Sequence, residues 1–198
     1  MPDLLSLGFD TSAAHCAAAL VLGDRLLALR EEEMARGQAE RLFPLLDELL
    51  AEAGKVWADL DVIGVGTGPG NFTGIRISVA AARGLALSLG IPAIGIGVTE
   101  AAAYGLPRPC RVAVPARNGE VFFQDFGTDP AQPLPLQAAI HDLPPGPVVS
   151  PARFPRAEAI ARLALDRRAL PDLPRPAPIY LRPADAAPAR DRGPVILT

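Results

Sequence analysis

The chain has 198 residues, of which 49% are hydrophobic, which is enough for one large domain or two small lobes with a real core. Its net charge of −3 argues against a protein that grips nucleic acid alone, because neutralising phosphates requires clustered Lys and Arg. No early segment resembles a signal peptide, no apolar run is long enough to span a bilayer, and the two cysteines form neither a disulfide framework nor a metal clip. We therefore expect a soluble cytoplasmic protein with no membrane partner.

The first part of the chain predicts three strands joined as a meander, at residues 4–9, 16–22 and 25–33. Gly23-Asp24 supplies a two-residue hairpin turn between the second and third strands. The first strand ends in Asp10-Thr11-Ser12, a carboxylate beside two hydroxyls. This grouping could orient a phosphate or a metal-bound water, and it could equally cap the strand through Asx-type hydrogen bonds.

Residues 38–53 predict an amphipathic helix that Gly54 ends. Leucines at three- and four-residue spacing form one stripe, at Leu42, Leu45, Leu46, Leu49 and Leu50. Pro44 fits best if the helix begins near Arg41, because the first turn does not need the missing N–H. Core packing explains most of this stripe.

Residues 61–89 predict a buried strand, a glycine-rich turn and a helix, with Thr73 as the N-cap. The helix carries two apolar or small stripes, Ile75, Val79, Ala82, Ala86, Leu89 and Ser78, Ala81, Leu85, Ser88. A helix that is apolar nearly all round is buried on both sides. One side must face its own sheet, so the other needs a second helix or a second protein.

The glycine-rich turn suggests phosphate, because free N–H groups at a helix start favour an anion. However, Ile75 follows Gly74 where a Walker A loop needs lysine, and Asn71 stands where GxGxxG needs its third glycine. We favour a tight turn that lets strand and helix pack closely. The candidates for any ligand contact are Asp10, Thr11, Gly68 and Gly70.

Residues 91–97 predict a further strand, followed by a helix through about residue 104. Beyond Leu106 the composition shifts to proline and arginine, which suggests a lobe boundary. Strands are expected at residues 111–116 and 120–126, joined by a type I′ turn at Asn118-Gly119. Residues 128–156 predict mostly loop and residues 156–170 a helix, with Cys110 in a loop and the last residues poorly ordered unless docked.

Catalytic motifs are missing from the sequence. His15 and His141 form no HxxxH or HExxH metal pair, and Phe72 occupies the central position that a GxSxG elbow gives to serine. Ser12, His15 and Asp10 are triad residue types, but we interpret their proximity in sequence as incidental. We therefore expect no catalysis by this chain alone.

Four segments, FDTS (9–12), MARGQAERLFPLLDELL (34–50), VGTGPGNFTGIRISVAAARGLAL (65–87) and IPAIGIGVTEA (91–101), resemble the TsaB (YeaZ) family. The residues 178–183 resemble its closing motif. The resemblance implies an α/β, actin-like, sugar-kinase and Hsp70-like (ribonuclease-H-like) fold of two lobes, at residues 1–106 and a reduced 107–183, with a flexible tail at 184–198. The chain departs from the family at Gln38, where many members have histidine, and at Pro115, where the pattern has aspartate.

The resemblance also implies a role as a non-catalytic partner subunit in the synthesis of threonylcarbamoyladenosine on tRNA. It implies that the chain binds and activates a TsaD-like threonylcarbamoyltransferase together with a TsaE-like ATPase, forms a homodimer in isolation, and meets tRNA only through the complex. It implies no cofactor of its own, since ATP and metal belong to the partner subunits. The predicted interface is formed by Leu42, Leu45, Leu49, Ile75, Ser78, Ala81, Ala82 and Leu85. The alternatives are a stand-alone small-molecule kinase or ATPase of the same fold, and a peptidase.

Overall fold

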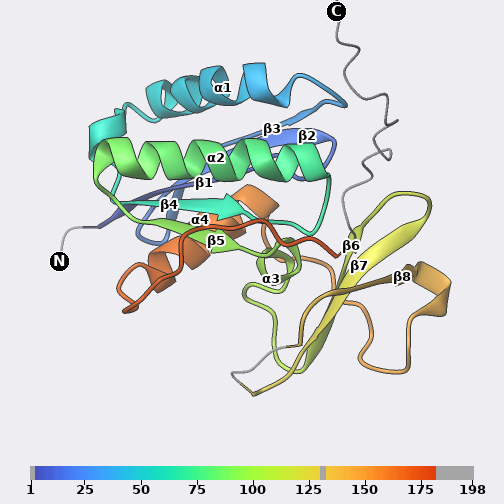
Figure 1. Cartoon of the computed structure of the whole chain (residues 1–198). Helices are drawn as coiled ribbons and strands as arrows, with labels where there is room; N and C mark the ends of the chain where they lie inside the picture. The colour runs from blue at the N-terminus through green and yellow to red at the C-terminus, as the bar shows by residue number, and fades with distance from the viewer. Residues whose placement is uncertain (1–2, 130–132, 182–198) are drawn as a thin grey trace, which may run out of the picture.

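A computed structural model describes residues 3–129 and 133–181. Its main sheet has the strand order β3-β2-β1-β4-β5 (Figure 1). β1, β2 and β3 form the predicted antiparallel meander, while β4 pairs in parallel with β1 and β5 with β4. The strands are β1 (Leu5–Asp10), β2 (His15–Leu22), β3 (Arg25–Glu33), β4 (Val62–Gly66) and β5 (Ala93–Ile96).

Two helices, α1 (Gln38–Glu52) and α2 (Phe72–Leu89), lie side by side on one face of this sheet (Figure 1). The leucine stripe of α1 is buried beneath it, as the spacing predicts. α1 begins three residues before Arg41, so Pro44 lies in the helix interior, where it removes one backbone hydrogen bond. The short 3₁₀ helix η1 (Trp57–Asp59) follows α1 on the way to β4.

The N-cap of α2 is Asn71, and the prediction of Thr73 is wrong. The Asn71 side-chain oxygen accepts a hydrogen bond of 2.9 Å from the Gly74 N–H. The glycine-rich turn therefore leads into the helix two residues earlier than the hydroxyl of Thr73 suggested.

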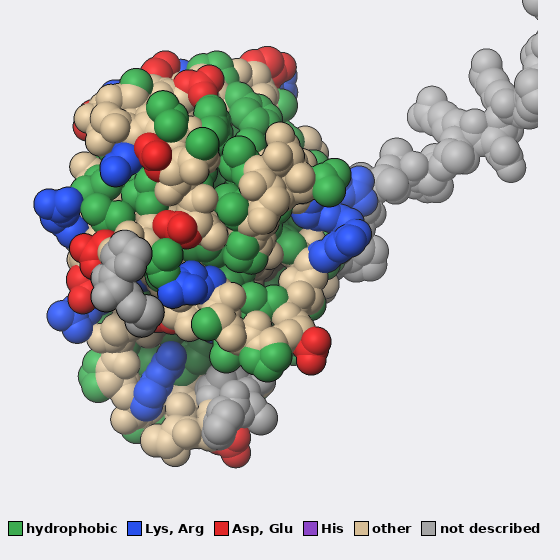
Figure 2. Space-filling model, turned by 90° about the vertical axis from the view of Figure 1, so that its left-hand side faces the viewer, with side chains coloured by type: hydrophobic (Ala, Val, Ile, Leu, Met, Phe, Trp, Pro, Cys, Tyr) green, Lys and Arg blue, Asp and Glu red, His purple; other side chains and the backbone are tan. Residues whose placement is uncertain are grey.

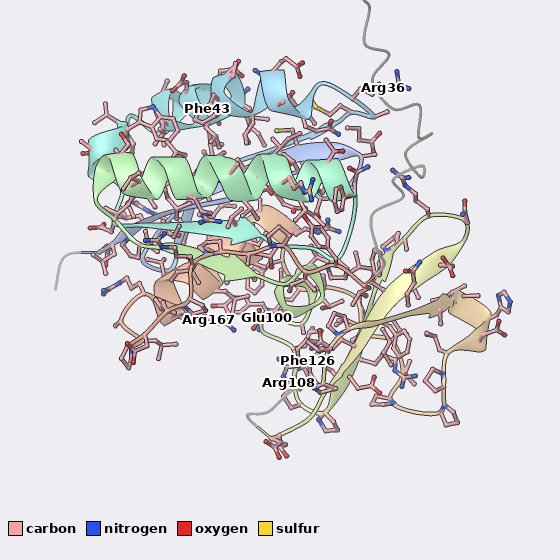
Figure 3. The ribbon with its side chains drawn as sticks, in the orientation of Figure 1. Arg36, Phe43, Glu100, Arg108, Phe126 and Arg167 are labelled. Atoms are coloured by element: carbon pink, nitrogen blue, oxygen red, sulfur yellow. The ribbon has the colours of Figure 1, made fainter. Side chains whose placement is uncertain are left out.

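The opposite face of the sheet is covered by α4 (Arg156–Arg167), which comes from the second half of the chain (Figure 1). Glycines in the central strands allow this close approach, because a Cβ at Gly64 would lie 2.6 Å from the Ile160 carbonyl oxygen. Ser6 Oγ donates a hydrogen bond of 2.9 Å to the Ala161 carbonyl. α3 (Val98–Ala102) packs beside α4, and the Arg167–Glu100 ion pair joins the two helices (Figure 3).

α4 falls within the predicted second lobe at residues 107–183 but packs on the main sheet, and the division into lobes at 1–106 and 107–183 stays a prediction. That helix completes the core of the first lobe, with Ile160 fully buried between β4 and β5 neighbours. The chain then returns to the glycine-rich turn, where the Ile179 N–H donates to the Thr67 carbonyl over 2.8 Å. The predicted tail at 184–198 lies outside the described residues.

The remainder of the second half forms a smaller antiparallel sheet of β6 (Cys110–Pro115), β7 (Glu120–Phe126) and β8 (Leu136–Ala139), with η2 (Ile140–Asp142) after it. Asn118 and Gly119 have φ values of 58° and 75°, as the predicted type I′ turn requires. Cys110 begins β6 and does not lie in a loop. The prediction of loop over residues 128–156 missed β8, a short edge strand.

α2 is long and apolar enough to cross a membrane by length and composition alone, contrary to the expectation that no segment is (18 residues, mean hydropathy 1.2). Its residues Ile75, Ser78, Val79 and Ala82 are instead buried against the sheet, as in the core helix of a globular domain. Only 28% of the helix is buried within the chain. The exposed apolar side of α2 is therefore a candidate interaction surface.

Candidate functional site

Asp10 is fully buried at the end of β1, at the centre of a polar cluster that includes the partly exposed Arg156. Its Oδ1 accepts from the Ser12 N–H over 3.2 Å. Its Oδ2 accepts from Ser12 Oγ over 2.9 Å and from Arg156 Nη1 over 2.9 Å, and lies 2.8 Å from His15 Nε2. The predicted candidate is thus brought together with a histidine and with an arginine that lies 146 residues further along the chain.

This environment favours the ionised form of the Asp10 carboxylate. Burial alone would raise the pKa of Asp10, but the hydrogen bonds and positive charges of His15 and Arg156 hold that pKa well below its usual range. Three of the four contacts are made by Oδ2 and one by Oδ1. The chain's own groups therefore surround Oδ2, whereas Oδ1 accepts one hydrogen bond, from the Ser12 N–H.

Ser12, His15 and Asp10 lie close together, but the hydrogen bonds among them differ from those of a catalytic triad. Ser12 Oγ bonds the carboxylate and not the imidazole, and His15 Nδ1 lies 3.2 Å from Glu31 Oε1. A serine nucleophile needs a hydrogen bond to its general base. Within residues 3–129 and 133–181 no hydrogen bond joins Ser12 to His15, so this cluster lacks the geometry of a peptidase.

The glycine-rich turn packs directly onto the turn that follows β1. The Asn71 N–H donates to the Ser12 carbonyl over 2.6 Å, and Thr11 Oγ1 donates to the Gly74 carbonyl over 2.7 Å. A Cβ at Gly66 would overlap the Asp10 carboxylate. The turn's glycines therefore serve the close packing that we favoured from the sequence, while ligand contacts by Asp10, Thr11, Gly68 and Gly70 stay a prediction.

The described part of the chain holds no group of three or more His, Cys, Asp and Glu residues arranged to bind a metal ion. Cys16 is buried, and burial raises the pKa of its thiol to about 11. At neutral pH the group is a protonated thiol, which is a poor nucleophile and a poor metal ligand.

The second candidate is an apolar groove between α1 and α2, with a volume of about 570 Å³. Figure 2 shows hydrophobic side chains gathered on the upper part of the molecule, where the layer of α1 and α2 lies. Phe43 projects from α1 with 44% of its surface exposed (Figure 3), and Gly84 on α2 would leave an added Cβ without any neighbour within 4 Å. The groove is lined by Ala39, Leu42, Phe43, Ile77, Ala80, Ala81, Gly84, Leu85 and Ser88.

The structure places the predicted interface residues at different depths, and their role in an interface stays a prediction. Leu42, Ala81 and Leu85 line the groove. The other five do not line the groove and are buried in the chain's own core, as Leu42 almost entirely is, namely Leu45, Leu49, Ile75, Ser78 and Ala82. The reason is that spacing identifies an apolar stripe without saying which of two stripes faces the sheet.

Sequence reasoning missed Phe43, the most exposed large side chain of the groove. Its signal was available, because Phe43 is a large apolar residue one position away from the buried Leu42 and therefore off the leucine stripe. Ser88, a member of the second predicted stripe of α2, lines the groove together with Gly84.

Comparison with known proteins gives consistent matches. A family model described as "TsaD: tRNA N6-adenosine threonylcarbamoyltransferase" matches residues 31–171. An uncharacterised protein of Mycobacterium tuberculosis (strain H37Rv) is 33% identical over 197 residues, covering 92% of this chain and 93% of that protein. The Escherichia coli K12 protein named "tRNA threonylcarbamoyladenosine biosynthesis protein TsaB" is 34% identical over 128 residues, which are 62% of this chain and 55% of that protein.

Among solved structures, "YeaZ from Pseudomonas aeruginosa" matches with a TM-score of 0.67 and 26% identity, over 90% of this chain and all (100%) of that one. A second Pseudomonas aeruginosa structure, described as an uncharacterised protein with similarity to peptidase YeaZ, matches with a TM-score of 0.72 and 27% identity over the same shares. The alignment thus covers nearly the whole of each solved chain but only about half of the Escherichia coli relative.

Proposed function

The chain belongs to the TsaB (YeaZ) family, and from this membership we propose that it is a non-catalytic partner subunit in the synthesis of threonylcarbamoyladenosine on tRNA. The comparisons confirm the family and the actin-like α/β fold that the sequence predicted. The curated relatives named TsaB carry the name of this biosynthesis, which supports a role in the same pathway.

The observation that carries the proposal is the contrast between the two candidate sites. The Asp10 carboxylate is buried and engaged by Ser12, His15 and Arg156 of the same chain. The groove between α1 and α2 is open and apolar. A chain with this pair of features is suited to binding a protein and poorly suited to chemistry.

The partner that we propose for the groove is a TsaD-like threonylcarbamoyltransferase, which supplies the active site. Phe43 offers a large anchor on α1, while Ala80, Ala81 and Gly84 let a second backbone approach α2 closely. A standard interface buries about 800 Å² on each side, so helices beyond this groove also contribute. In isolation we expect the same surface to form a homodimer.

Other components follow from the same proposal. A TsaE-like ATPase joins the pair, ATP and metal belong to these partner subunits, and tRNA is met only through the complex. The net charge of −3 is consistent with a subunit that does not hold tRNA alone. We propose a cytoplasmic location, where tRNA is modified.

A stand-alone kinase or ATPase remains the alternative of another class. It needs a carboxylate that can hold magnesium or a water, and Asp10 is the carboxylate placed at the end of β1. A coupled ATPase assay on the isolated protein separates the two functions, since our proposal predicts no turnover above the buffer rate. Titration calorimetry should likewise give no submicromolar nucleotide affinity.

The interface is tested with Ala81→Arg, which places a charged side chain inside the apolar groove. The matched control is Ala169→Arg, at an exposed alanine just after α4 on the opposite face of the sheet. Sedimentation and a pull-down with the TsaD-like transferase should show loss of self-association and of partner binding for Ala81→Arg alone. Retention of both by Ala81→Arg would overturn the assignment of this face, and modified-nucleoside analysis of tRNA from depleted cells would test the pathway itself.

A further inference from the structure

The groove between α1 and α2 has room for a few apolar side chains. Its volume of about 570 Å³ lies within the range of about 300–1,000 Å³ that is usual for small-ligand pockets. Among the described residues, those that line the groove carry no charge, and Ser88 is the one polar side chain among them. A short, apolar and uncharged segment therefore fits the groove by size and by chemistry.

The described part of the chain ends beside α2, the helix that forms one wall of the groove. The Tyr180 ring lies 4.7 Å from the Phe72 ring, measured between centroids. The Tyr180 hydroxyl also accepts a hydrogen bond of 2.9 Å from Arg76 Nε. These contacts hold the chain against the first turns of α2 at the point from which residues 182–198 continue.

The sequence beyond Leu181 contains one run of large apolar residues, Val195-Ile196-Leu197. The thirteen residues before this run, 182–194, are all Ala, Pro, Gly, Arg or Asp. Burial of large aliphatic side chains is favourable, and the apolar run carries three of them without a charge. The apolar run therefore matches the groove, while residues 182–194 form a polar spacer.

The spacer is long enough to bring the apolar run into the groove. Phe72 and Arg76 lie on the side of α2 away from α1, so the chain has to cross a helix about 10–12 Å wide. Gly84, at the middle of the groove wall, is about 12 Å further along the helix than Arg76. A spacer of thirteen residues spans about 20 Å as a coil and about 43 Å when extended.

We propose that the apolar run Val195-Ile196-Leu197 occupies the groove of its own chain in the isolated protein, so that a partner has to displace it. Attachment within one chain gives an effective concentration in the millimolar range, at which even a weak contact is populated. The apparent affinity for a second protein then falls with the fraction of chains whose groove is free. The displacement rests on the proposed function, whereas the docking of the run does not.

Docking is tested with an engineered cysteine pair, Gly84→Cys with Ile196→Cys, in the full chain. A Cβ at Gly84 would have no neighbour within 4 Å, and the natural Cys16 and Cys110 are buried. With oxidised glutathione as the oxidant, this pair should form an intrachain disulfide at least about tenfold faster than the control pair Thr73→Cys with Ile196→Cys. Thr73 is exposed on the same helix, outside the groove. The rate should not depend on the protein concentration.

Displacement is tested by the affinity of the TsaD-like transferase for a variant in which residues 195–197 are all replaced by Asp. Loss of the apolar run should raise this affinity about two- to tenfold, because the groove is then free in every chain. The matched control replaces Ala184, Ala187 and Ala189 by Asp, which adds the same three negative charges to the spacer and leaves the run intact. The control should bind the transferase like the unmodified protein.

The outcomes separate this inference from the proposed function. Equal disulfide rates for the two cysteine pairs would overturn the inference, and the proposed interface would stand if Ala81→Arg still abolished partner binding. A rate that rises with protein concentration would also overturn it, because a second copy would then supply the apolar run. If the disulfide forms as expected but the aspartate variant binds no more tightly than its control, displacement is refuted. If Ala81→Arg also leaves partner binding intact, the proposed function fails while the docked run stands.

Discussion

Replacing Arg156 by methionine tests whether the Asp10 cluster is a structural lock. Arg156 Nη1 donates to Asp10 Oδ2 over 2.9 Å, from a side chain that is 20% exposed to a carboxylate that is 0% exposed. Methionine keeps much of the apolar stem and removes only the guanidinium. The carboxylate would retain Ser12 and His15 as donors but lose its permanent positive charge.

The expected loss is about 3 kcal/mol of unfolding free energy. Breaking a buried ion pair by removing one partner costs roughly 3–5 kcal/mol, because the remaining charge stays buried. The lower end applies here, since the three donors from Ser12 and His15 remain and Arg156 is partly exposed. A domain of ordinary stability, about 5–15 kcal/mol, would still fold with this substitution.

Urea unfolding followed by circular dichroism measures the effect, with Arg153→Met as the control. Arg153 is exposed on the segment that leads into α4 and donates to the Gly105 carbonyl over 3.3 Å, so its replacement should cost no more than about 1 kcal/mol. A loss below about 1 kcal/mol for Arg156→Met would refute the reasoning. Such a result would mean that the Asp10 site can accept another cation at little cost, which would strengthen the kinase alternative.

Five further predictions concern packing, capping and pH. Gly8→Ala should destabilise the fold by at least about 1–3 kcal/mol in urea unfolding, because its Cβ would overlap backbone atoms of α4, whereas Gly84→Ala should stabilise by about 0.5–1 kcal/mol. Asn71→Ala should cost about 1 kcal/mol by the same assay, since it removes the N-cap of α2. Leu49→Ala should cost about 2–5 kcal/mol, because Leu49 is fully buried. Unfolding measured against pH should show that the stability due to Asp10 is present above the unfolded carboxyl pKa near 4 and is lost as pH falls towards its depressed folded pKa.

Local patterns were sufficient for the meander, for α1 and for the strand, turn and helix from Val62 to Leu89. Hairpin turns and apolar periodicity within about twenty residues predict these elements. The close packing of the glycine-rich turn could be predicted from its glycines, whereas ligand contacts there stay a prediction. Its true partner, the turn after β1, could be expected only from the parallel order of β1 and β4.

The position of α4 could not be read from its own pattern. Its inward residues predict a helix with one buried face, but nothing local says which sheet it covers. The decisive features are Gly8 and Gly64, which meet the α4 backbone from about 150 and about 100 residues away. The ion pair of Arg156 with Asp10 also joins distant parts of the chain, so local sequence patterns could not predict it.

Comparing substitutions at Leu49 and Phe43 tests which side of α1 contacts the partner. Both are large apolar residues of α1, but Leu49 is 0% exposed and Phe43 is 44% exposed. Leu49→Ala should therefore lower stability and leave the affinity of the folded fraction for the transferase nearly unchanged. Phe43→Ala should leave stability within about 1 kcal/mol and weaken the complex by more than about 1 kcal/mol, as expected for an aromatic anchor.

The two measurements have to be made on the same preparations, because a destabilised variant also loses binding through its unfolded fraction. Working at temperatures where both variants are fully folded by circular dichroism removes that ambiguity. Equal losses of affinity for Leu49→Ala and Phe43→Ala would mean that α1 rearranges on binding and exposes its core stripe. The buried leucines would then contact the partner after all, and the groove seen in the isolated chain would be only the first point of contact.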